Sequence, residues 1–199
     1  NKEVTEVIVD NNPEKYLIDN NLIGIKEEDT ESVQIINDVF DELLSDSTLT
    51  KLSLTSNDKA WCGALVYEVL TQTNALNSIS KSGAKPNSAE AYSRVRAKEY
   101  LNVGTKTDDP KIGDIIVVSR EVGGKTQHHV AFYAGTDKYE NVIMIGGNQS
   151  NTGTGGEVSF KTVTKNYTIL GYRRLENMAD IKEATAAGYR ADYGVIWKW

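Results

Sequence analysis

The sequence contains few of the residues that proteins use for cross-links and for transition-metal sites. Its 199 residues include one cysteine, Cys62, two adjacent histidines, His128 and His129, and three prolines. A single cysteine excludes an intramolecular disulfide and a cysteine-rich zinc site. Two neighbouring histidines leave little else for binding a transition metal. The first chemical question is therefore what the one cysteine does.

Long apolar runs and clusters of positive charge are also missing. The longest apolar runs, Ile115–Val118 and Ile143–Ile145, fall far short of the roughly 20 residues that a membrane helix needs. The net charge is −6, and Lys and Arg do not cluster, so nucleic acid is not an expected partner, because that affinity comes mainly from cations that neutralise phosphates. With 39% hydrophobic and 25% charged residues, the composition is typical of a folded globular domain.

The first half of the chain has a helical pattern. Pro13–Leu22 is predicted as a short helix, with Asn12 as its N-cap and Pro13 at the first helical position. Three further segments are predicted from pattern and composition: a core-facing helix over Thr30–Leu44, a loop over Ser45–Lys59, and a helix from Ser88 to about Leu101.

The segment that begins at Cys62 is predicted as a buried helix. Its apolar residues fall at i, i+3, i+4, i+7 and i+8 and form one stripe: Cys62, Leu65, Val66, Val69 and Leu70. Residues suited to capping a helix stand just ahead of it, at Ser56, Asn57 and Asp58. We therefore expect Cys62 in the first turn, where the helix dipole lowers the pKa of a thiol.

The second half of the chain changes to a strand pattern. Five strands are expected, over Gly113–Ser119, His129–Gly135, Asn141–Ile145, Val158–Val163 and Thr168–Arg174, and the last two complete a meander. A hairpin turn is expected over Glu121–Gln127, which contains Gly123-Gly124. Helices followed by strands indicate an α+β fold with an antiparallel sheet. We expect one domain over 1–199, with a helical part over 1–50, a motif region over 57–174 and a C-terminal extension over 176–199.

A catalytic cysteine requires a base, and the candidates are His128 and His129. On a strand, His129 shares a face with Ala131 and Tyr133, whereas His128 shares the more apolar face with Val130. Because its face is less apolar, we favour His129 as the histidine whose side chain points toward the helix bearing Cys62. Strand alternation alone leaves both histidines as candidates.

The base also needs a polar group that fixes which ring nitrogen carries the proton. The oxygen of the acyl group needs hydrogen-bond donors that stabilise its negative charge. Asn148, at the end of the next predicted strand, is the leading orienting group, with Gln149, Asn151 and Asp114 as rivals. The backbone N–H of Cys62 is the first candidate oxyanion donor. The further candidates for oxyanion or substrate contacts are Asn57, Asp58, Trp61 and Gln149.

Each of these residues also has a purely structural interpretation. A lone cysteine in an apolar helical stripe is commonly a small buried hydrophobe. A histidine at a strand start is often structural, Trp61 is typical of a packing residue, and Gly146-Gly147-Asn148 is typical of a turn. The order Cys, His, Asn alone is a weak signal.

Longer blocks carry a more specific signal. The chain contains, in order, Trp61-Cys62-Gly63-Ala64-Leu65-Val66, Pro110–Val118 followed by Arg120, His129–Gly135, Ile145–Asn151 and Gly171-Tyr172-Arg173. The first block resembles the Trp-Cys-(small)-Ala-Phe-Val opening of a bacterial and phage branch of the NlpC/CHAP-type cysteine peptidases. The next three resemble that branch's Pro-x-x-Gly-Asp-Ile-Val-Val-Phe, Gly-His-Val-Gly-Phe-Tyr-x-Gly and Leu-Gly-Gly-Asn-Gln-x-Asn segments, and the last resembles its closing strand.

This resemblance implies a papain-like fold, in which N-terminal helices pack on a central antiparallel sheet of about five to six strands and the nucleophile stands at a helix N-terminus. It implies Cys62 as the nucleophile, His129 as the base and Asn148 as the third polar group, and it places His128 where the family has glycine. Two departures are visible: Gly146 stands where many CHAP domains have glutamate, and Trp61 stands where many NlpC domains have aspartate.

The function implied is a cysteine amidase or endopeptidase that cleaves amide bonds in the stem peptides or cross-bridges of bacterial peptidoglycan, without metal or organic cofactor. The alternatives are a deamidase or acyltransferase with the same triad, and a non-catalytic wall-binding module. The expected partners are muropeptides, and an immunity or inhibitor protein if the protein is an effector. Because the chain begins at Asn1 rather than Met, we expect a secreted or cell-envelope form from which an N-terminal segment was removed.

Overall fold

The computed structural model describes residues 12–26, 61–73, 96–149 and 156–175. Several predictions lie outside these ranges. They are the helix over Thr30–Leu44, the loop over Ser45–Lys59, the caps Ser56, Asn57 and Asp58, the cap Ser88, the rival Asn151, and the extension over 176–199. No helix in the described ranges is both long enough and apolar enough to cross a membrane.

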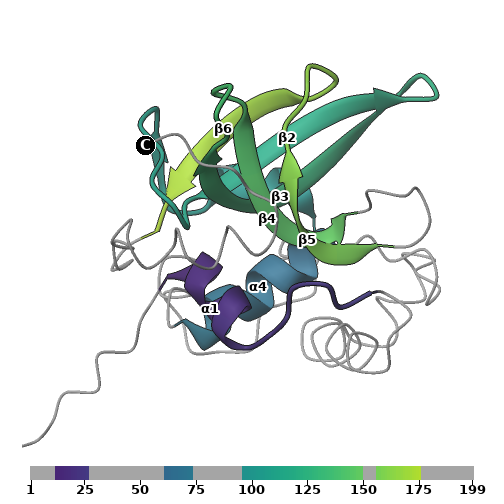
Figure 1. The fold of residues 1–199 in the computed structure, drawn as a ribbon. Helices are drawn as coiled ribbons and strands as arrows, with labels where there is room; N and C mark the ends of the chain where they lie inside the picture. Colours follow the sequence, from purple (N-terminus) through teal and green to yellow (C-terminus); the bar gives the residue numbers. More distant parts are fainter. Residues whose placement is uncertain (1–11, 27–60, 74–95, 150–155, 176–199) are drawn as a thin grey trace, which may run out of the picture.

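Within the described residues, the strands form one six-stranded antiparallel sheet, shown in Figure 1. Its strands are β1 (Thr105–Thr107), β2 (Ile115–Val122), β3 (Lys125–Thr136), β4 (Val142–Gln149), β5 (Glu157–Thr162) and β6 (Thr168–Arg174). The spatial order is β1-β6-β2-β3-β4-β5. With helices packed on this sheet, the predicted α+β class is confirmed.

The predicted meander is correct for β2 to β5 and wrong for the last strand. β6 does not extend the sheet beyond β5 but returns to pair with β2, so that β2 lies between β3 and β6. The reason is burial: Ile115, Ile116, Val117 and Val118 of β2 are fully buried, as expected of a central strand. The short strand β1, which the sequence did not predict, then pairs with β6.

The turn between β2 and β3 is tighter than the predicted segment Glu121–Gln127. Val122 pairs with Lys125, which leaves only Gly123 and Gly124 in the turn. Their φ angles are +58° and +74°. Two consecutive positive φ angles define the mirror-image turn that suits the twist of a hairpin, and glycine adopts them without strain.

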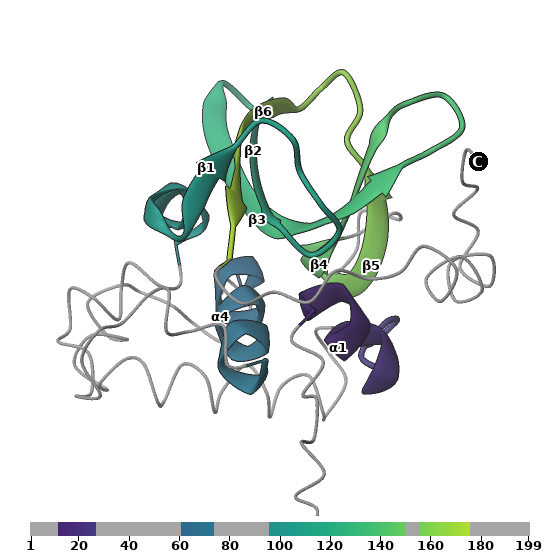
Figure 2. The same cartoon turned by 90° about the vertical axis from the view of Figure 1, so that its left-hand side faces the viewer.

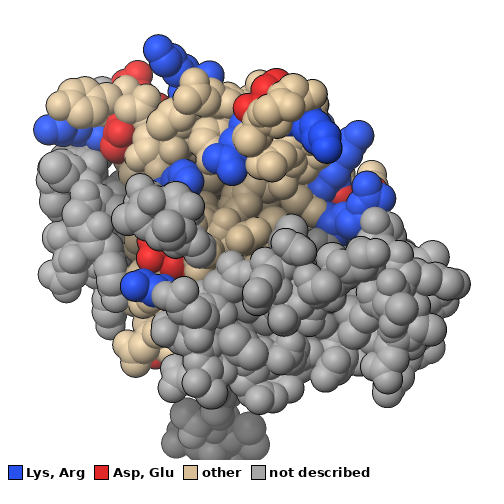
Figure 3. Space-filling model, turned by 90° about the vertical axis from the view of Figure 1, so that its right-hand side faces the viewer, with Lys and Arg blue, Asp and Glu red and all other residues tan. Residues whose placement is uncertain are grey.

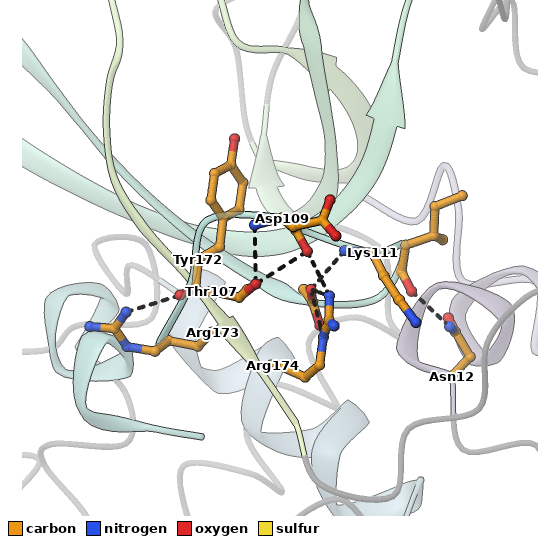
Figure 4. Close-up of polar contacts among 9 residues, drawn as sticks. Asn12, Thr107, Asp109, Lys111, Tyr172, Arg173 and Arg174 are labelled. Carbon is orange, nitrogen blue, oxygen red and sulfur yellow. Dashed lines mark hydrogen bonds and ion pairs between the residues drawn. The ribbon is translucent and has the colours of Figure 1, made fainter. Parts of the chain in front are cut away.

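Helix α1 (Pro13–Asp19) begins as predicted and ends three residues early. The side-chain oxygen of Asn12 accepts hydrogen bonds from the backbone N–H groups of Glu14 (3.0 Å) and Lys15 (3.5 Å), which caps the helix. The Asn12 amide nitrogen donates to the carbonyl of Ile112 at 2.9 Å, just before β2 (Figure 4). One side chain therefore caps α1 and fastens it to the sheet.

Helix α4 (Cys62–Gln72) buries the predicted stripe, since no residue of that stripe is more than 4% exposed. The stripe packs with Val130 and Phe132 of β3 in the main core. Figure 2 shows α1 and α4 on the same side of the sheet. The described end of the helix predicted from Ser88 is the 3-10 helix η2 (Ala97–Asn102), and the hydroxyl of Tyr100 donates to the carbonyl of Gly63 at 2.9 Å.

A second, smaller core lies on the other face of the sheet. It contains Ile116, Val118, Ala131 and Met144, with partly buried Tyr167 and Tyr172 packed against it. Because side chains alternate along a strand, residues of β2 and β3 contribute in turn to the two cores. This alternation decides which face each candidate site residue occupies.

A buried carboxylate joins the start of β2 to the end of β6. Asp114, which is 0% exposed, accepts a hydrogen bond from the Lys111 backbone N–H at 2.7 Å. It also accepts from the guanidinium of Arg174, with an Nη2–Oδ2 distance of 2.8 Å (Figure 4). The same Arg174 nitrogen donates to the carbonyl of Asp109 at 2.8 Å. The charge of Asp114 is thus fully compensated within the fold.

We predict that Asp114→Asn lowers the free energy of unfolding by about 3 kcal/mol, because it leaves Arg174 without its carboxylate and Lys111 N–H without a charged acceptor. Asp108→Asn is the matched control, since the Asp108–Lys106 pair is 3.9 Å long and its side chains are 91% and 70% exposed. The control should change the free energy by less than about 1 kcal/mol. Urea denaturation of the two variants measures the difference, and equal effects would contradict this account.

Candidate functional site

Cys62 is the first residue of α4 and is 3% exposed. Three backbone N–H groups act on its thiol, that of Val130 in β3 and those of Cys62 and Gly63 at the helix start. Burial is the larger effect and raises the pKa of the thiol, while the three N–H groups oppose it. The helix start acts in the predicted direction, but burial outweighs it.

His129 of β3 is half-buried, and its imidazole Nε2 lies 3.2 Å from Oε1 of Gln149. Burial lowers the pKa of His129 to about 4; the Gln149 hydrogen bond opposes this shift, and the charges of Lys161 and Arg120 add to it. The ring is therefore neutral at neutral pH.

The Gln149 side chain decides which ring nitrogen of His129 carries the proton. Its amide nitrogen donates to the carbonyl of Gly146 at 3.0 Å and to that of Ser159. These bonds turn its oxygen toward the imidazole, and an amide oxygen only accepts. Nε2 of His129 must then carry the hydrogen, which leaves Nδ1 as the basic nitrogen.

The hydrogen-bond partner of His129 is thus Gln149, a rival in the sequence analysis, and not the leading candidate Asn148. Gly146 pairs with Ser159 and Gln149 with Glu157, so β4 has one more residue than β5 in this stretch. Asn148 lies within this bulge with a φ of +56°. A bulge of one residue reverses the alternation of the strand and turns Gln149 to the face of His129.

The expected direction of the His129 side chain was wrong. Helix α4 packs on the face that carries Val130 and Phe132, and His129 pairs with Val118 of the other core. His129 therefore points to the face away from α4. The thiol of Cys62 approaches β3 from the side of α4, next to the backbone N–H of Val130. Among the described residues, no hydrogen bond joins its sulfur to the imidazole of His129.

Trp61, the residue before α4, is 2% exposed, and its ring lies against Gly147 of β4. A Cβ at Gly147 would overlap the Trp61 ring, so only glycine fits there. A Cβ at Gly156 would lie 2.6 Å from the Asn148 side-chain oxygen and 3.1 Å from Nε1 of Trp61. Within the described ranges, the Trp61 N–H has no hydrogen-bond partner. The structure thus brings Trp61 and Asn148 together beside Cys62.

The other sequence candidates occupy different places. Asp114 is engaged by Arg174 and does not contact His129. His128 pairs with Ser119 and faces the opposite side of β3 from His129. The charges of Arg120 and Lys161 act on the His129 ring. The sequence indicated Arg120 only as part of a motif block, and it did not indicate Lys161. The alternation of side chains along β2 could have indicated Arg120, because Arg120 lies two residues after Val118, the cross-strand partner of His129.

In the part of the chain that the structure describes, no group of three or more His, Cys, Asp and Glu side chains is arranged to hold a metal ion. Comparisons with protein-family models, with curated proteins and with solved structures give no match.

We predict that the folded protein loses stability as the pH falls from about 6.5 toward 4. In this window an unfolded histidine takes up a proton, whereas the buried His129, with its pKa lowered to about 4, does not. Urea denaturation at several pH values should show a smaller decrease for His129→Gln than for the wild type. The same decrease in both proteins would show that His129 titrates normally in the folded state.

We also predict that Gly147→Ala destabilises the protein by about 1–3 kcal/mol, because the added methyl group overlaps the Trp61 ring. Gly171→Ala is the matched control: Gly171 also lies in a strand, but its nearest neighbour would be 3.4 Å from an added Cβ, an ordinary contact. Thermal denaturation compares the two, and a harmless Gly147→Ala would disprove the close packing of Trp61.

Proposed function

We propose that this protein is a papain-like cysteine amidase or endopeptidase that acts on bacterial peptidoglycan, with Cys62 as the nucleophile and His129 as the base. One observation carries the proposal: the thiol of Cys62 stands at a helix start, and the backbone N–H of Val130, the residue that follows His129, acts on it and lowers its pKa. Cys62 thus contacts β3 beside the residue that carries the candidate base, and the two side chains lie on opposite faces of that strand. The motif blocks that resemble NlpC/CHAP-type peptidases support the substrate class.

In the proposed reaction, both groups are neutral at rest, because burial raises the pKa of Cys62 and lowers that of His129. The thiol proton therefore moves to Nδ1 of His129 as the sulfur attacks the amide carbonyl. This step requires the imidazole to turn from its resting position toward Cys62, and catalytic hydrogen bonds often tighten only when substrate binds. The backbone N–H of Cys62 is the first donor to the developing oxyanion.

The remaining steps follow from the same two groups. The bond between the carbonyl carbon and nitrogen breaks, and His129 gives its new proton to the leaving amine. A water molecule, whose proton passes to His129, then attacks the thioester, which releases the carboxylic acid and restores the thiol. We assign the orienting role to Gln149 rather than Asn148, because Gln149 accepts from Nε2–H and leaves Nδ1 free for the proton.

One observation favours a second candidate function, a non-catalytic wall-binding module with the same fold. Cys62 is only 3% exposed and burial raises its pKa, as expected for a structural cysteine. The same triad acting as a deamidase or acyltransferase is a variant of the first proposal. Product analysis separates the three: shortened stem peptides indicate hydrolysis, released ammonia indicates deamidation, and no product indicates a binding module.

We predict that Cys62→Ala abolishes cleavage of purified peptidoglycan, as measured by mass spectrometry of the released muropeptides. Removal of one buried sulfur should leave the protein folded, which circular dichroism and thermal denaturation check. Undiminished hydrolysis by Cys62→Ala would falsify the proposal.

We further predict that Gln149→Met lowers kcat by about 10²-fold or more, because the thioether keeps the length of the side chain but no longer holds the imidazole tautomer. Asn148→Ala should have a smaller effect, since Asn148 does not bond to the ring. Nitrogen chemical shifts of His129 report the tautomer directly and should show Nε2–H in the wild type. A larger loss with Asn148→Ala would return the orienting role to Asn148.

A further inference from the structure

Trp61 carries a hydrogen-bond donor that the described part of the fold leaves unused. Its side chain is 2% exposed, and its indole N–H is buried without a hydrogen-bond partner among the described residues. Buried polar groups in native proteins nearly always have a partner, and an exception often marks a functional position. An indole nitrogen only donates, so the group that would complete it is an acceptor. The Trp61 N–H is thus available to the acceptor of a ligand.

The side-chain oxygen of Asn148 lies beside this N–H. A Cβ at Gly156 would lie 2.6 Å from Oδ1 of Asn148 and 3.1 Å from Nε1 of Trp61, so the two atoms border the same small space. None of the hydrogen bonds among the described residues uses the Asn148 side chain, because Gln149 takes the bond to His129. An unused donor and an unused acceptor are therefore neighbours, and half-buried Asn148 is the more exposed of the two.

The backbone of Asn148 is held in a conformation that residues other than glycine rarely adopt. Its φ is +56°, within the bulge that β4 forms between Gly146 and Gln149. Asparagine tolerates this left-handed region better than most residues, and backbone strain of this kind is common at binding and active sites. The bulge sends Gln149 to the imidazole and leaves the Asn148 amide for another task.

This pair of side chains is joined to the candidate nucleophile. Trp61 immediately precedes Cys62, the first residue of α4, and the Trp61 ring lies against Gly147 of β4. The N–H of Val130 in β3 acts on the Cys62 thiol. A Cβ at Gly146, the residue before Gly147, would lie 3.5 Å from the carbonyl oxygen of Val130. The thiol and the indole therefore meet the same stretch of the neighbouring strands β3 and β4.

Both members of the pair are uncharged, so their ligand is selected by hydrogen bonding rather than by charge. The face shown in Figure 3 likewise has a hollow of uncharged surface, with Lys and Arg side chains around it. The matching ligand group is neutral and offers one acceptor to the indole N–H and one donor to the Asn148 oxygen. A secondary amide is such a group, because its carbonyl accepts and its N–H donates.

We propose that the indole N–H of Trp61 and the side-chain oxygen of Asn148 bind a secondary amide of the substrate, next to the amide that Cys62 attacks. This inference rests on the proposed function and narrows its substrate class. The thiol lies at β3 and the indole N–H lies beside Gly156, just before β5, so the two positions hold different amides. Two parts of peptidoglycan carry this chemistry, the peptide bonds of the stem and the acetamido groups of the glycan strand.

The first test observes the indole N–H directly and needs no hydrolytic activity. The chain has three tryptophans, so the nitrogen-labelled Cys62→Ala protein gives three indole resonances, which Trp61→Phe, Trp197→Phe and Trp199→Phe assign. If Trp61→Phe does not fold, the other two variants assign Trp61 by elimination. The probe is N-methylacetamide, and we expect it to move the Trp61 proton alone downfield. An unmoved Trp61 proton, or an equal shift of all three, overturns the inference.

The role of Asn148 is tested with N,N-dimethylacetamide, which keeps the carbonyl but has no N–H. The Cys62→Ala protein should bind this probe more weakly than N-methylacetamide, and a further Asn148→Gly substitution should remove the difference. The matched control is Asn21→Gly, because Asn21 is exposed and also has a positive φ, +54°, which glycine adopts without strain. The control should keep the difference. A difference that persists in Asn148→Gly, or that disappears in Asn21→Gly, contradicts the assignment of Asn148.

The source of the amide is tested in the same Cys62→Ala protein. A synthetic stem peptide without sugar and N-acetylglucosamine without peptide are added in separate titrations. A shift of the Trp61 resonance with the first supports the site and assigns it to a peptide bond, and a shift with the second supports it and assigns it to an acetamido group. No shift with either overturns the inference.

Kinetics separate this site from the proposed reaction. In the protein that retains Cys62, Asn148→Gly should raise KM for a purified muropeptide by about 3- to 10-fold with little change in kcat, as expected for the loss of one hydrogen bond between uncharged groups. A lower kcat at unchanged KM would place Asn148 in the reaction and overturn the inference. A Trp61 resonance that responds to the probes in a protein that cleaves no muropeptide overturns the proposed function alone.

Discussion

The buried carboxylate of Asp114 fixes the point at which the central strand begins. Its side chain binds Arg174 at the end of β6, while its backbone carbonyl accepts from the N–H of Tyr133 in β3 at 2.7 Å. The neighbouring Gly113 donates to the Tyr133 carbonyl at 2.8 Å. One residue therefore sets the register of β2 against both of its neighbours, and that register makes Val118 the partner of His129.

The electrostatics of the candidate site follow from a competition between burial and local hydrogen bonds. At Cys62, three N–H groups favour the thiolate, yet the loss of water around the sulfur has the larger effect on its pKa. At His129, burial and two cations disfavour the imidazolium more than Gln149 favours it. The resting state is thus a neutral thiol and a neutral imidazole, which differs from the thiolate that a helix N-terminus alone predicts.

Sequence pattern predicted what depends on local chemistry. The buried stripe of α4, the Asn12 cap and the Gly123-Gly124 turn all follow from residue spacing or backbone preference, and the structure has each of them. The return of β6 to β2 depends on contacts between segments more than 40 residues apart, which no local pattern encodes. The exchange of Asn148 for Gln149 depends on one extra residue in β4, because a single bulge reverses every side chain beyond it.

The attachment of α1 has a consequence for the order in which the chain folds. Asn12 caps its helix locally, but its second hydrogen bond goes to Ile112, 100 residues later, and Gly24 donates to the carbonyl of Val158 at 2.7 Å. During synthesis from the N-terminus, these partners emerge long after α1 itself. A seven-residue helix is marginal alone in water. Stable docking of the N-terminal segment must therefore wait until the ribosome has produced most of the sheet.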